Sequence, residues 1–148
     1  MSLLKNSLTE AMKDAMRARD KERLNTIRLI LSECKQIEVD ERIELDDARV
    51  LSIMDKMLKQ RRESIEHFRA AGRDDLRAIE EAEMVIIQGF MPEPLSEADV
   101  RQAIAVAIQE VGAEKMQDMG KVMALLKPAL QGRTDLSKVS IWVKEQLA

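Results

Sequence analysis

The sequence is poor in aromatic residues, and its 148 positions include one cysteine, five glycines and three prolines. Tyrosine is absent, and the aromatic side chains are those of Phe68, Phe90 and Trp142. Aromatic and β-branched residues dominate β-sheets, whereas the apolar residues here are mainly leucine, isoleucine, valine, alanine and ten methionines. This composition favours helix packing. The single cysteine, Cys34, excludes an internal disulfide, and its place on an apolar helical stripe indicates a core residue.

Long apolar runs are also absent. No run approaches the ~20 residues that a transmembrane helix needs, and the N-terminus lacks the apolar core of a secretory signal. We therefore expect no membrane partner. Since a lone cysteine also fits a reducing compartment, we predict a cytoplasmic location.

The residue clusters of most active sites and metal sites are missing as well. His67 is the one histidine, and no group of metal-ligating residues or nucleophile–base pair lies near it in the sequence. Neither of the glycine-rich phosphate-binding motifs, GxGxxG or GxxxxGK[ST], is present. The many carboxylates alternate with lysine and arginine at helical spacing, which is typical of a solvated face. We predict no catalytic residue, no metal and no cofactor, and the sequence identifies no autonomous enzyme.

Apolar residues recur at spacings of three and four along nearly the whole chain, which predicts an all-α protein. The first part of the chain is expected to form four helices, which begin near Leu4, Asp20, Asp46 and Asp74. Three more helices are expected after them, with N-caps at Ser96, at Asp118 and at either Thr134 or Asp135. Pro128 is expected to bend or shorten the sixth helix.

A pair of prolines separates the fourth and fifth expected helices. Pro92 and Pro94 lack a main-chain N–H group, and each favours an extended conformation in the residue before it. The sequence therefore predicts a two-domain multihelical array. Its parts are an N-terminal helical domain over residues 1–91, a proline hinge over 92–95 and a small three-helix C-terminal domain over 96–148.

The last part of the chain has the opposite charge balance to the rest. Residues 115–148 hold six basic and three acidic residues, whereas residues 1–114 hold 18 basic and 24 acidic residues. Glycine–basic pairs stand near the starts of the last two expected helices, where free N–H groups attract phosphate. The pattern predicts a nucleic-acid-binding site made of Gly120, Lys121, Gly132, Arg133 and Lys138. Alternatively, Gly132 ends a helix and the lysines are ordinary solubilising charges.

A second basic cluster lies on the third expected helix and consists of Lys56, Lys59, Arg61 and Arg62. Arg61 falls on the apolar stripe, where a guanidinium must pair with a carboxylate, extend outward or face a polar groove. Two interpretations follow: an ion pair with Glu80 or Glu83 of the next helix, or a ligand-binding role.

Several segments resemble the YqeY-like family, which shares its fold with the tail domain of GatB, a subunit of the tRNA-dependent glutamyl/aspartyl amidotransferase. The matching segments run in order along the chain: Lys56–Ser64, Phe68 with 71–73, Asp75-Leu76, Phe90–Pro92 with 95–97, Asp118–Met123, and Gly132-Arg133. One departure is visible. Where the family usually continues the last pair as Ala-Asp-Gly-Lys, this chain has Thr134-Asp135-Leu136-Ser137-Lys138 and lacks the turn glycine.

The resemblance implies a larger N-terminal helical domain, a small GatB-tail-like C-terminal domain and a link to tRNA. It implies partners among tRNA, the amidotransferase and other translation-related proteins. Family descriptions add a carbon–nitrogen ligase activity with glutamine as amido-N-donor, but the chain resembles only a module without the domains for that chemistry. We therefore expect a tRNA-binding or amidotransferase-associated accessory module. The alternatives are a helical protein–protein adaptor and a subunit contributing to the ligase activity.

Overall fold

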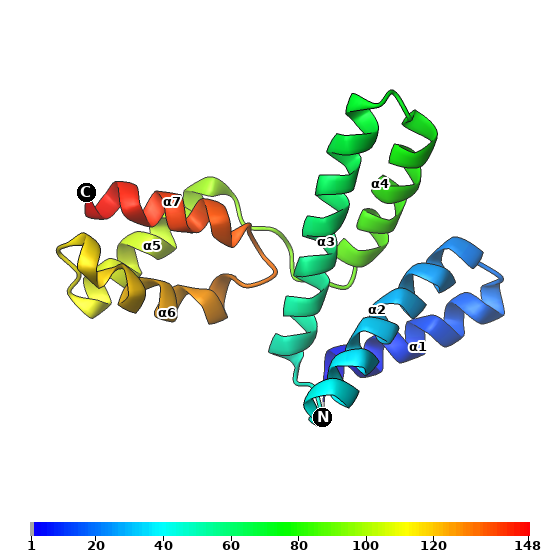
Figure 1. The fold of residues 1–148 in the computed structure, drawn as a ribbon. Coiled ribbons are helices and arrows are strands. Elements are labelled where there is room, and N and C mark those ends of the chain that lie inside the picture. The colour runs from blue at the N-terminus through cyan, green and yellow to red at the C-terminus, as the bar shows by residue number, and fades with distance from the viewer. Residues whose placement is uncertain (1) are drawn as a thin grey trace. The chain divides into compact units, whose positions relative to one another are not determined.

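A computed structural model describes residues 2–148, and the regular secondary structure of these residues is entirely helical (Figure 1). This confirms the predicted all-α fold. The helices are α1 (Leu3–Ala18), α2 (Lys21–Glu41), α3 (Asp47–Ala70), α4 (Asp74–Gln88), α5 (Glu97–Val111), the 3-10 turn η1 (Met116–Asp118), α6 (Met119–Leu130) and α7 (Leu136–Leu147). In the described chain, no helix is both long enough and apolar enough to cross a membrane.

The helices group into two compact units, an N-terminal unit that ends at Pro92 and a C-terminal unit of Glu93–Ala148. Pro92 and Pro94 lie in the non-helical segment between α4 and α5. That this segment acts as a hinge stays a prediction.

The N-terminal unit consists of α1 to α4, whose apolar stripes meet in one core. Short polar side chains begin three of its helices: the Ser2 hydroxyl accepts the Lys5 N–H, Asp20 accepts the Arg23 N–H, and Asp46 accepts the Arg49 N–H. These bonds satisfy main-chain donors that have no partner within the helix. The largest fully buried side chains of this core are those of Leu8, Ile27, Ile30, Leu45, Met54 and Ile87, and Cys34 is buried among them, as predicted.

The C-terminal unit packs α5, α6 and α7 around a second core, in which Val100, Ile104, Val122, Leu130 and Val139 are fully buried. The Ser96 hydroxyl accepts the Asp99 N–H at the start of α5. Of the two alternatives for α7, Asp135 is the N-cap and accepts the Ser137 N–H.

One local expectation for α6, the cap at Asp118, needs correction. Asp118 precedes the helix, but its carboxylate makes no capping bond to α6. It accepts the N–H groups of Glu114 and Lys115 instead, at 3.1 and 3.3 Å, and so closes the turn before η1. Pro128 lies inside α6, which ends at Leu130, two residues beyond it. A bend at Pro128 stays a prediction.

Candidate nucleic-acid interface

The first glycine–basic pair, Gly120 and Lys121, lies in the first turn of α6, and both residues are exposed. A Cβ atom added at Gly120 would meet no atom within 4 Å, so the main chain is open to solvent there. The neighbouring Asp118 partly offsets the charge of Lys121. Hydrogen bonds from the Glu114 and Lys115 N–H groups hold the pKa of Asp118 below its usual range, and the Lys121 charge contributes to that lowering.

The second pair lies in the loop between α6 and α7. Gly132 has a φ of 78°, a left-handed conformation that favours glycine, and it follows the last residues of α6 as the alternative interpretation predicts. The half-buried Arg133 fastens this loop to the segment before α5. Its carbonyl accepts the Leu95 N–H at 2.8 Å, and its Nε donates to the Glu93 carbonyl at 3.4 Å. Arg133 therefore has a structural role in the C-terminal unit.

The structure separates the two glycine–basic pairs. Lys121 lies at the start of α6 and Gly132 just beyond its end, so about 15 Å of helix stands between them at 1.5 Å per residue. The exposed Lys138 lies in the first turn of α7. These cations cannot contact one phosphate together. They could contact a backbone at several points, since one strand carries a charge about every 3.4 Å.

Charge is divided between the helices of the C-terminal unit. Residues 93–114, which include α5, hold one basic and five acidic residues, whereas residues 115–148, which include α6 and α7, hold six basic and three acidic residues. The one basic residue of the first group, Arg101, pairs with Glu97 and Glu145 and lies 5.0 Å from the ring centre of Trp142. The division was missed by sequence reasoning, which grouped residues 93–114 with the rest of the chain.

The residues of the second basic cluster, on α3, differ in their exposure to solvent. Lys56, Lys59 and Arg62 are exposed on α3, but Arg61 is mostly buried between α3 and α4. Its Nε and Nη2 atoms each lie 2.8 Å from the Glu83 carboxylate. The ion-pair interpretation of Arg61 is therefore confirmed: its guanidinium binds the Glu83 carboxylate of α4.

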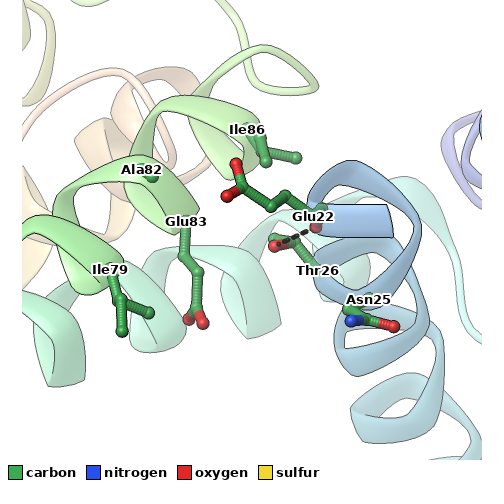
Figure 2. A pocket seen from close by; sticks show the side chains of 7 residues that line it. All are labelled: Glu22, Asn25, Thr26, Ile79, Ala82, Glu83 and Ile86. Carbon is green, nitrogen blue, oxygen red and sulfur yellow. Dashed lines mark hydrogen bonds between the residues drawn. The ribbon is translucent and has the colours of Figure 1, made fainter. Parts of the chain in front are cut away.

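A cavity of about 180 Å³ lies between α2 and α4 (Figure 2). The polar side chains of Glu22, Asn25 and Thr26 come from α2 and face Ile79, Ala82, Glu83 and Ile86 of α4. The Thr26 hydroxyl donates to the Glu22 carbonyl at 3.0 Å, and Glu83 is paired with Arg61. The Thr26 hydroxyl thus donates to a main-chain carbonyl rather than to a general base that could activate it. Within residues 2–148, no group of three or more His, Cys, Asp or Glu residues could hold a metal ion.

Comparison with known proteins gives one family and a set of related proteins. A family model described as Yqey-like protein matches residues 5–147. A protein of Pyrenophora tritici-repentis named "Altered inheritance of mitochondria protein 41, mitochondrial" is 31% identical over 137 residues, which cover 90% of this chain and 75% of the relative. The protein of the same name from Saccharomyces cerevisiae is 34% identical over 129 residues, 83% of this chain and 68% of the relative. That of Eremothecium gossypii is 42% identical over 85 residues, 57% of this chain and 46% of the relative.

These names contradict the predicted cytoplasmic location, which is wrong: the related proteins are named as mitochondrial. The prediction rested on a missing apolar signal core and a lone cysteine. Neither feature distinguishes the two compartments, because transit peptides are amphipathic rather than apolar and a buried, unpaired thiol such as Cys34 forms no disulfide in either compartment.

Proposed function

Because the chain belongs to the Yqey-like protein family, we propose that it is an accessory module that docks on the body of tRNA. The observation that carries this proposal is the division of charge in the C-terminal unit. The six basic residues of 115–148 are concentrated on and around α6 and α7, whereas five of the six charged residues of 93–114, on or beside α5, are acidic. A phosphate backbone would meet α6 and α7 first.

The proposed contacts are Lys121, Lys138 and the open main chain at Gly120, with Arg133 holding the loop between the two helices. Trp142 is half-buried beside the Arg101 guanidinium. It is the only aromatic ring of the C-terminal unit and offers little surface for base stacking. The module would therefore recognise the shape and backbone of tRNA rather than its base sequence.

The size of the basic surface limits the affinity. About two to four phosphates can be neutralised, and each contributes about −0.7 to −0.9 to the slope of log affinity against log salt concentration. We expect a Kd nearer micromolar than nanomolar. Catalysis is not part of the proposed role: an association with an amidotransferase would place the carbon–nitrogen ligase chemistry in other subunits. Glutamine hydrolysis by the purified chain alone would contradict the proposal that this chain has no catalytic role.

The test is tRNA binding by fluorescence anisotropy across a salt series, with both a mitochondrial and a cytosolic tRNA. Replacing Lys121 and Lys138 together by glutamine should weaken binding and make the salt slope shallower by about 1.5. The matched control replaces Lys13 and Lys35, exposed lysines of α1 and α2. A third variant, Lys56→Gln with Lys59→Gln, measures the contribution of the exposed part of the second basic cluster.

The two lysine replacements leave Arg133 in place, because its bonds to residues 93–95 support the fold. Circular dichroism should show unchanged helicity in all three double variants. If the Lys121/Lys138 variant binds tRNA like the parent, or if the control variant loses as much affinity, the proposed interface is wrong.

A further inference from the structure

A groove between α5 and α6 in the C-terminal unit has no role in the proposed tRNA docking. It is open and mainly apolar, with a volume of about 450 Å³. Ala107 and Leu126 are buried at its base, while Val106 and Leu125 on its two sides are 48% and 42% exposed. Two partly exposed branched side chains that face one channel form a surface that a second apolar surface could cover.

The α5 edge of this groove carries two carboxylates that form no ion pair with a side chain of the C-terminal unit. Asp99 and Glu110 line its two ends, and neither side chain forms an ion pair or hydrogen bond with any residue in the described range 2–148. They are eleven residues apart on one helix, which is about 16 Å or three turns. Arg101 is engaged with Glu97, Glu145 and Trp142 and leaves this edge uncompensated.

We propose that this groove binds an amphipathic helix of a partner protein, with lysine or arginine at both ends of its apolar stripe. Apolar side chains at helical spacing would cover Val106 and Leu125. Basic side chains about eleven residues apart would meet Asp99 and Glu110. A groove bounded by two helices suits a third helix, because side chains of one helix pack into the spaces between those of its neighbours.

Charge distinguishes this occupant from two others. The phosphates of RNA would be repelled by Asp99 and Glu110. A second copy of the chain, docked groove to groove, would place the same negative edge against itself, because a two-fold interface brings the same patch of both subunits together. The groove is thus complementary to a basic helix and independent of the tRNA surface.

The experiment is a selection from a displayed library of 18-residue helical peptides, using the full-length chain as target. Peptides are counter-selected against the double variant Val106→Gln with Leu125→Gln, which removes the apolar sides of the groove at exposed positions. We expect enriched peptides to carry an apolar stripe between lysine or arginine residues about eleven apart. Their affinity for the counter-selection variant should be about tenfold weaker, as expected for the loss of two central apolar contacts.

One further double variant separates the contribution of charge from that of apolar contact. Asp99→Asn with Glu110→Gln should weaken binding of the enriched peptides about fivefold at low salt and less at high salt. The matched controls, Ile141→Gln on α7 and Glu114→Gln beyond α5, should bind like the parent. Amide chemical shifts of the labelled chain should change along α5 and α6 on addition of peptide.

Three results would overturn the proposal: no enrichment over the counter-selection variant, enriched peptides with acidic ends, or self-association of the parent that Val106→Gln with Leu125→Gln abolishes. The last would identify a second copy as the occupant. Because the groove variants retain Lys121 and Lys138, their tRNA affinity reports on the docking function separately.

Discussion

The Arg61 guanidinium of α3 donates a 2.8 Å hydrogen bond to the Glu83 carboxylate of α4, and Glu80 lies 3.9 Å away on the same helix. The Arg61 and Glu83 side chains are only 13% and 25% exposed. Arg61 also donates to the Met57 carbonyl one turn earlier in its own helix. The pair therefore joins two helices of the N-terminal unit where solvent screening is weak.

Replacing Glu83 by glutamine should lower the free energy of unfolding by about 1–2 kcal/mol, because it leaves a largely buried guanidinium with a more distant partner. The measurement is urea unfolding followed by circular dichroism. The control is Glu66→Gln, which breaks an exposed pair with Arg69 on α3. That change should cost less than about 0.5 kcal/mol. Equal losses in the two variants would show that burial of the Arg61–Glu83 pair has no energetic weight.

Acid should destabilise the N-terminal unit through Asp47. This carboxylate accepts hydrogen bonds from the Ser2 hydroxyl and the Leu4 N–H, which hold the pKa of Asp47 below its ordinary value of 3.8. A pKa lowered by folding stabilises the fold above the ordinary value, and that stabilisation disappears as the pH falls through the lower folded value. Between about pH 5 and pH 2, the parent should lose stability more steeply than Asp47→Asn. Parallel curves of urea midpoint against pH would contradict this expectation.

The two glycines of the candidate interface should respond oppositely to alanine. Gly120 is helical and has open space around it, so Gly120→Ala should stabilise the protein by about 0.5–1 kcal/mol. Gly132 has a φ of 78°, and Gly132→Ala should destabilise it by about 1 kcal/mol or more. Thermal or urea unfolding measures both. Weaker tRNA binding by the more stable Gly120→Ala protein would indicate that the main chain there contacts the ligand.

Cys34 should be unreactive in the folded protein. Its side chain is fully buried, and burial raises the pKa of the thiol, which reduces the thiolate that attacks an alkylating reagent. Iodoacetamide should label native protein far more slowly than protein in concentrated urea, as followed by mass spectrometry. Labelling at equal rates in the two conditions would mean that the core around α2 opens readily.

Much of the helical pattern was predictable because helix starts are determined locally. Asp20, Asp46 and Ser96 each cap the helix that the sequence assigned to them, since a capping side chain needs only the N–H groups two or three residues ahead. Asp118 shows the limit of this reasoning. Its carboxylate bonds to residues before it, a choice that depends on the conformation of the 3-10 turn rather than on spacing.

The candidate site was less accessible from the sequence. The two glycine–basic pairs are twelve residues apart in sequence, but their separation in space depends on the conformation of the residues between them, most of which form α6. The sequence did not predict the acidic edge of α5, because it did not show that Arg101 contacts Glu145 and Trp142. Ion pairs between helices far apart in sequence determine which carboxylates keep no basic partner. By contrast, Glu80 and Glu83 could be named beforehand as candidate partners of Arg61 in one of two interpretations, because α3 and α4 are consecutive helices whose apolar stripes follow from periodicity.

The net charge of the C-terminal unit does not describe how the unit interacts with a charged partner, because its acidic and basic residues are unevenly divided between its helices. Its seven basic and eight acidic residues nearly cancel. At physiological ionic strength, however, charges are screened beyond about 8 Å, so an approaching polyanion senses the nearest helix rather than the sum. Within that distance, the basic residues on α6 and α7 would attract a polyanion and the acidic residues on α5 would repel it, which would turn α6 and α7 toward it. The orientation at first encounter would be selected by the field, and the association rate should fall with added salt even though the chain as a whole is acidic.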